Sequence, residues 1–257
     1  MKISALLAPI AYTIVTQAAA VIFAYILSPL AGVFVFQPVS GTGAPVFNAL
    51  IFVLLPIIGT AIYLRLRKIR SARAFYAIIE AFLIMLLTFL ILSTAIEALA
   101  LSAIIALAVA IISYLALSKG KRSLKIVVGV IMCSEAGAYL AIIFLPPTVY
   151  LIFLFFALYD LIAVFRGPLR SILDEPAFGM LSVDFGIISV GLGDEVFYSM
   201  VPATAYFVYG LSAALTVTLA MDIGVLITLL LLSKRKALPG LTIPLLISLI
   251  FFLFLFR

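Results

Sequence analysis

The chain has no histidine and no tryptophan, and its 257 residues include a single cysteine, Cys133. Without an imidazole, histidine-based catalytic triads, histidine zinc sites and histidine-ligated haem are excluded. One thiol excludes an internal disulfide and a cysteine-based metal cluster. Any acid–base chemistry must therefore use carboxylates, lysine, tyrosine or the lone thiol.

Charged residues are also scarce, at 10% of the chain, whereas 67% of residues are hydrophobic and the mean hydropathy is +1.42. Soluble domains carry about 25% charged and about 45–50% apolar residues. This composition excludes a water-soluble globular protein and a disordered chain. It predicts an all-α, polytopic membrane protein with a single transmembrane domain over residues 1–257 and no large soluble domain.

The apolar runs predict nine membrane-spanning helices, each of about 20 residues. We expect them at about residues 3–36, 46–64, 74–96, 99–117, 126–145, 149–165, 185–201, 206–232 and 238–256. The first run is longer than the apolar core of a signal peptide, which is about 7–15 residues, so we expect it to be retained. A polar stretch, residues 166–184, separates the sixth segment from the seventh.

The basic residues follow the alternation that nine crossings predict. They lie before the first segment and after the second, fourth, sixth and eighth, so that fifteen of the sixteen fall on one side of the membrane. The other side holds only Arg257. Cytoplasmic loops carry the excess of lysine and arginine. We therefore expect a multi-pass protein of the cell membrane with its N-terminus in the cytoplasm and its C-terminus outside.

Six acidic side chains lie within the apolar segments, where ionisable groups are costly and mark functional sites. They are Glu80, Glu135, Asp160, Asp194, Glu195 and Asp222. Asp160 should lie roughly 9 Å from the cytoplasmic end of its segment and Asp194 up to roughly 15 Å, so the two carboxyls should meet on antiparallel helices. Gly191 and Gly193 let a backbone approach Asp194 closely. The structural alternative is a glycine-lined helix crossing with a neutral, hydrogen-bonded aspartate.

Three motifs resemble those of the presenilins, in the same order. Residues 159–164 (Tyr-Asp-Leu-Ile-Ala-Val) and 167–170 (Gly-Pro-Leu-Arg) are similar to the sixth-helix motif and its continuation. Residues 191–194 (Gly-Leu-Gly-Asp), followed by 197–199 (Phe-Tyr-Ser), are similar to the seventh-helix motif. Residues 237–241 (Ala-Leu-Pro-Gly-Leu) are similar to the ninth-helix motif, which reads Pro-Ala-Leu in that family. The chain thus resembles a microbial, archaeal, presenilin-like intramembrane aspartyl protease.

This resemblance implies a scaffold of five segments, residues 1–147, and an active site carried by the last four, residues 148–257. Asp160 and Asp194 would form the catalytic pair, one ionised and acting as general base on a water, the other protonated and polarising the scissile carbonyl. Substrate-binding roles are implied for Tyr159, Gly191, Leu192, Gly193, Pro239, Gly240 and Leu241. Substrates would be transmembrane helices in the lipid bilayer. We expect no cofactor, metal, nucleic acid or obligatory protein partner.

The sequence departs from the presenilin pattern in two places. Gly240 stands where alanine is usual, which removes a methyl group, and we expect this to be tolerated with an altered fit. The linker between segments six and seven is only about 18 residues, so we expect no maturation cleavage. Residues 166–175 could form a short amphipathic helix. Residues 178–185 either pair with an extended substrate by strand addition or form a solvated connector.

The remaining acids have blander interpretations. Glu195 lies about 100° around the helix from Asp194 and should not share its face. For Glu135 and Asp222 we favour polar helix–helix contacts over a part in water access. We expect Glu80 to pair with the basic loops, and Cys133 to be a small packed residue.

Other functions remain open at this point. A signal-peptide-peptidase-like protease carries similar motifs in the opposite orientation, which the charge bias disfavours. Prepilin peptidases share the Gly-x-Gly-Asp pattern but lack the companion motifs. A proton-coupled transporter would use the buried carboxylates as carriers, and it predicts inverted repeats that this sequence does not show. A catalytically inactive protein of the same fold is disfavoured only because both aspartates are present.

Overall fold

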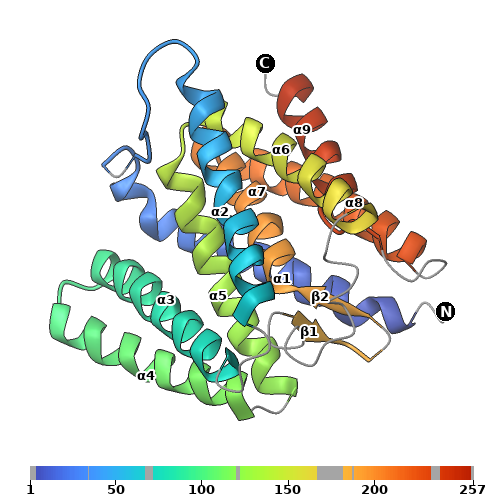
Figure 1. The fold of residues 1–257 in the computed structure, drawn as a ribbon. Helices are drawn as coiled ribbons and strands as arrows, with labels where there is room; N and C mark the ends of the chain where they lie inside the picture. Colours follow the sequence, from blue (N-terminus) through green and yellow to red (C-terminus); the bar gives the residue numbers. More distant parts are fainter. Residues whose placement is uncertain are drawn as a thin grey trace.

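The computed structural model describes residues 4–33, 35–66, 72–119, 122–166, 182–186, 188–232 and 238–255. Within these residues the chain forms helices and one short hairpin (Figure 1). Their bounds are α1 Ser4–Leu27, η1 Ser28–Leu30, α2 Ala44–Leu66, α3 Ala72–Ala95, α4 Leu99–Lys119, α5 Arg122–Ile143, α6 Pro146–Phe165, β1 Ser182–Asp184, β2 Ser189–Gly191, α7 Leu192–Tyr209, α8 Leu211–Leu232 and α9 Thr242–Leu255.

The second to sixth predicted segments coincide with α2 to α6 to within a few residues. Six helices in the described part of the chain are long and apolar enough to cross a membrane: α1, α3, α4, α5, α6 and α8. The chain is therefore a multi-pass membrane protein. The apolar stretches of α2 and α9 are shorter, and α7 carries two acids in its first turn. Nine crossings and the orientation of the termini stay predictions.

The prediction that a helix begins at Phe185 is wrong. Residues 182–186 and 188–191 instead form a hairpin in which β1 pairs antiparallel with β2, Ser182 lying opposite Gly191. Gly186 has a φ of +95°, and its N–H donates to Asp184 Oδ1 at 2.7 Å, which closes the turn. Branched residues on both strands favour this extended backbone although the segment is apolar. Helix α7 therefore begins only at Leu192.

Three other boundaries also differ from the predicted ones. Gly210, with a φ of +86°, ends α7, so that residues 206–209 belong to α7 and not to α8. Residues 238–241, predicted to open the last helix, precede α9 and are not helical. The first helix ends at Leu27 and is followed by the short η1, which has a proline in its first turn.

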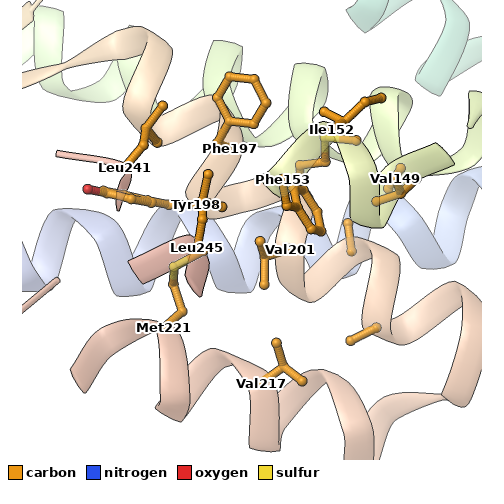
Figure 2. Packing of buried hydrophobic residues seen from close by; sticks show 14 of the residues in the cluster. Val149, Ile152, Phe153, Phe197, Tyr198, Val201, Val217, Met221, Leu241 and Leu245 are labelled. Atoms are coloured by element: carbon orange, nitrogen blue, oxygen red, sulfur yellow. The ribbon is translucent and has the colours of Figure 1, made fainter. Parts of the chain in front are cut away.

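Helix α7 lies at the centre of the fold and packs against α1, α5 and α8. Small residues permit this close packing, since a Cβ on Gly137 of α5 would lie 2.5 Å from Ser199 Cβ and 2.7 Å from the backbone nitrogen of Met200. Figure 2 shows apolar side chains of α6, α7, α8 and α9 meeting in this core. The α3–α4 pair lies to one side of it (Figure 1).

Candidate active site

Asp160 lies on α6 and is only 8% exposed. Its Oδ2 accepts a hydrogen bond of 2.7 Å from the backbone N–H of Leu241, in the segment that precedes α9. The same segment is tied to α6 by Thr242, whose hydroxyl donates to the carbonyl of Ala157 at 2.9 Å. The start of α9 is thus held against the Asp160 turn of α6.

Asp194 is the third residue of α7, in its first turn and directly after the hairpin. The sequence placed it deeper in a helix, which is wrong because the preceding residues form β2. Gly240 lies so close that a Cβ at that position would overlap Asp194 Oδ2. A Cβ on Gly191 would lie 3.5 Å from the same oxygen. The carboxyl group therefore occupies space left free by two glycines.

The two aspartates lie on either side of one stretch of backbone. Gly240 contacts Asp194, and the next residue, Leu241, donates to Asp160. The two carboxyl groups therefore border two consecutive residues of the same backbone segment. Among the described residues, no lysine or arginine forms an ion pair with either. Two carboxyls that share one site without a cation hold one proton between them more readily than two negative charges.

The segment 238–241 is anchored from α7 as well as from α6. Tyr198, one turn after Asp194, donates its hydroxyl to the carbonyl of Gly240 at 2.7 Å. In Figure 2 the Tyr198 ring lies beside Leu241, which is 6% exposed. Pro239 is buried as well. Two residues predicted from the ninth-helix motif, Gly240 and Leu241, therefore lie next to the aspartates, and Pro239 directly precedes them in the chain.

The other predicted substrate-binding residues are distributed differently. Gly193 faces open space, with no atom within 4 Å of the position of a Cβ. Tyr159 is half-buried and packs edge-on against Phe156. Leu192 is 5% exposed and packs with Tyr12, Cys133 and Val183, away from the aspartates. Residues 167–170 and 237, which complete two of the motifs, lie outside the described residues, as does the proposed amphipathic helix from residue 167 onward.

A cavity of about 80 Å³ lies beside Asp194, between α1, α7, α8 and the segment before α9. This volume has room for several water molecules. Besides Asp194, its polar lining includes Thr13 of α1, Tyr198 of α7 and Thr228 of α8. Thr13 and Thr228 could not be identified from the sequence, because an uncharged polar residue in a long apolar run carries no distinctive signal.

The acids outside the pair make contacts with other helices. Thr88 of α3 places its hydroxyl 2.9 Å from both carboxyl oxygens of Glu135 on α5, which confirms a polar helix–helix contact there. Thr13 donates to Glu195 Oε1, so Glu195 points toward α1. Asp222 lies near Gln17 without a hydrogen bond of good geometry.

Two further predictions concern Glu80 and Cys133. Glu80 is 9% exposed. In the part of the chain that the structure describes, it forms no ion pair with the basic loops, although the positive charge of Lys125 attracts its carboxyl group. Cys133 is fully buried and its thiol lies 3.4 Å from the carbonyl of Leu192, as expected for a packed residue. The described residues contain no group of three or more Cys, Asp or Glu placed to hold a metal ion.

Comparison with solved structures shows which fold this is. The chain is similar to a structure of a presenilin family intramembrane aspartate protease in a C222 crystal form, with a TM-score of 0.73 and 21% sequence identity over 96% of this chain and 97% of that one. A P2 crystal form of a presenilin family intramembrane aspartate protease gives a TM-score of 0.71 and 22% identity over 96% of each chain. No protein-family model matches the chain, and no curated protein sequence does. The fold is therefore presenilin-like.

Proposed function

We propose that this chain is a presenilin-like aspartyl protease that hydrolyses peptide bonds within the transmembrane helices of substrate proteins. The observation that carries the proposal is the placement of Asp160 and Asp194 on consecutive helices, on either side of the Gly240–Leu241 backbone. The fold in which they occur matches presenilin family intramembrane aspartate proteases over nearly the whole chain.

The proposed chemistry is water-mediated and needs no covalent intermediate. One ionised carboxylate takes a proton from a water molecule, whose oxygen attacks the scissile carbonyl carbon. The other carboxyl, protonated, donates a hydrogen bond to the carbonyl oxygen as negative charge develops there. The amide nitrogen then leaves with a proton from the pair. The cavity beside Asp194 is the proposed source of the water.

A substrate helix must unwind locally before its backbone can lie between the two aspartates. Gly191, Gly193 and Gly240 leave the surroundings of Asp194 free of side chains, and we assign them to binding this extended segment. Tyr159, Pro239 and Leu241 complete the proposed substrate-binding set. Leu192, which is buried with Tyr12 and Cys133, is proposed to shape the site indirectly by holding the first turn of α7. Strand addition to the β1–β2 hairpin is proposed for the neighbouring substrate residues, because the hairpin leads directly into α7.

The proposal also covers the substrates of the enzyme, its partners and its orientation in the membrane. Single-span membrane proteins are the proposed substrates, and the chain acts in the cell membrane without an obligatory partner. The cytoplasmic side is the side of the basic loops. In Figure 1, α1 begins near the hairpin, whereas α9 ends at the opposite end of the bundle, which supports an N-terminus and a C-terminus on opposite sides.

The test is cleavage of a single-span substrate with a glycine-containing helix, reconstituted with the purified protein in liposomes. Wild type should cut within the span, and Asp160→Asn and Asp194→Asn should each abolish cutting. A transition-state mimic of aspartyl proteases should block the reaction and should not bind either variant. Glu135→Gln, on a carboxyl away from the pair, is the matched control and should cut like wild type. Equal cutting by wild type and both aspartate variants would overturn the proposal.

A further inference from the structure

The first turn of α7 carries Asp194 but has little of its own to hold it in place. The helix begins at Leu192, and its preceding residue, Gly191, supplies no side-chain cap. The first backbone N–H groups of a helix have no partner within the helix. Gly191 and Gly193 on either side of Leu192 add backbone freedom to this turn. The direction of the Asp194 side chain must therefore be set by contacts with other helices.

One such contact is made by the residue next to Asp194. Glu195 is fully buried, and its Oε1 accepts a hydrogen bond from the hydroxyl of Thr13, which is 1% exposed on α1. Successive residues of a helix point about 100° apart, so a bond from Glu195 to α1 sets the direction in which Asp194 leaves the helix. That direction is toward Gly240 and the Asp160 side.

The Thr13–Glu195 hydrogen bond does more than fill the space between α1 and α7. A carboxyl group in the interior is less favourable than an apolar side chain of similar volume unless all its polar atoms are hydrogen-bonded. The second oxygen of Glu195, Oε2, has no partner among the described residues. A leucine at this position would satisfy packing alone. A buried polar contact of this kind can specify one arrangement of two helices over others.

We propose that Glu195 is a positioning residue, which aims Asp194 at the site by anchoring the first turn of α7 to Thr13. The inference rests on the proposed protease function, because it assigns Glu195 a role in that reaction without direct contact with the reacting atoms. Thr13 also lines the cavity beside Asp194, so the anchor and the aspartate lie on the same cavity.

The chain contains a second pair of the same composition that serves as an internal control. Thr88 of α3 bonds to Glu135 of α5 and both are buried. Among the described residues, neither is hydrogen-bonded to the aspartates or to the segment before α9. Loss of either threonine hydroxyl removes one buried interhelical hydrogen bond. Only the Thr13 pair lies beside Asp194 along the chain, so only its loss should move the aspartate.

The experiment measures kcat and KM for cleavage of the reconstituted single-span substrate. It also measures the melting temperature of each variant. Thr13→Val and Glu195→Leu should lower kcat by about tenfold or more with KM within about twofold, because a misdirected group slows the step after binding. Thr13→Ser keeps the hydroxyl and Glu195→Gln keeps an acceptor oxygen, so both should stay within about threefold of wild type. The double variant Thr13→Val/Glu195→Leu should be no slower than the worse single variant.

Two matched controls separate positioning from general stability. Thr88→Val should lower the melting temperature as much as Thr13→Val does, with kcat within about twofold of wild type. Thr16→Val removes a buried hydroxyl of α1 that donates to the carbonyl of Tyr12 in its own helix, and it should leave kcat unchanged.

The inference is overturned if Thr13→Val leaves kcat unchanged, if Thr13→Ser is as slow as Thr13→Val, or if Thr88→Val slows the reaction equally. Should Glu195→Leu fail to fold, the comparison of valine with serine at position 13 decides alone. The proposed function fails separately, when wild type and Asp194→Asn cut to the same extent.

Discussion

The α3–α4 pair and helix α7 are both regular α-helical regions, but they differ in how far their side chains are exposed. The outward face of the pair exposes large apolar side chains such as Phe82 and Ile104, at 53% and 66%. Its inward side forms a small cluster with the start of α5. On α7, by contrast, residues 197–205 are all buried and pack against α1, α5 and α8. One region faces lipid on one side, and the other is enclosed by protein.

This difference explains where the polar groups lie. An isolated carboxyl on a lipid-facing helix would have no partner in the hydrocarbon, whereas an enclosed helix offers hydrogen bonds and a hydrated cavity. Asp194 and Glu195 occur at the start of the enclosed helix, and the outward faces of α3 and α4 carry no such group among the described residues. Four predictions test whether stability and activity depend more on the enclosed region than on the lipid-facing one.

The largest expected effect is on packing within α7. Met200→Ala removes a fully buried side chain and should destabilise the protein by roughly 2–5 kcal/mol. Ile104→Ala, on the outward face of α4, should change stability by less than about 0.5 kcal/mol. Unfolding of both variants in mixed micelles would measure the two changes. Equal losses would remove the distinction between the enclosed and the lipid-facing helices.

The second prediction concerns the crossing of α5 and α7. Gly137→Ala would place a Cβ against the backbone of Met200, which cannot move aside as a side chain can, and should destabilise by roughly 1–3 kcal/mol. Gly59→Ala in α2 meets no atom within 4 Å and should be neutral or slightly stabilising. The same unfolding measurement applies. A neutral Gly137→Ala would show that the crossing has room to spare.

The third prediction acts on the aspartate and leaves the core intact. Gly240→Ala restores the alanine usual in presenilins, but here its Cβ would overlap Asp194 Oδ2 and displace the carboxyl group. We expect kcat to fall by about tenfold, since a displacement of about 1 Å can cost up to a hundredfold. Melting temperature should stay close to that of wild type. A fully active variant would show that Asp194 has a second productive position.

The smallest expected effect comes from one hydroxyl of α7. Tyr198→Phe removes the hydrogen bond to the carbonyl of Gly240 and should lower kcat/KM by about fivefold, the equivalent of about 1 kcal/mol. Tyr206→Phe, further along the same helix, is the control and should cut like wild type. If both variants behave alike, the segment before α9 does not depend on its bond to α7.

Long apolar helices could be predicted closely from the sequence, because hydropathy depends on local composition. Helices α2 to α6 lie within a few residues of their predicted positions. The start of α7 could not be predicted in this way. Apolar residues such as Ile188 and Val190 suit a buried strand as well as a buried helix, and periodicity alone does not separate the two. A glycine at position 186, between the β-branched Val183 and Val190, was the sequence signal that could have indicated a turn.

The candidate site was predictable to a similar degree. Three separate motifs pointed to Asp160, Asp194 and the segment around Gly240. In the structure these three lie close to one another. The anchor on Thr13 could not be anticipated, since α1 matches presenilins only in layout and its threonine is one polar residue among many apolar ones. Such contacts depend on the rotation of one helix against another, which composition does not encode.

Gly191 belongs to two structures at once, as the last residue of β2 and the residue that precedes α7. No linker separates the hairpin from the turn that carries Asp194. A shift of the strand is therefore transmitted from Gly191 through Leu192 and Gly193 to Asp194. A peptide that binds the hairpin edge would compete with the substrate strand that we propose to pair there, and it would also act on Asp194 without occupying the space between the two carboxyls.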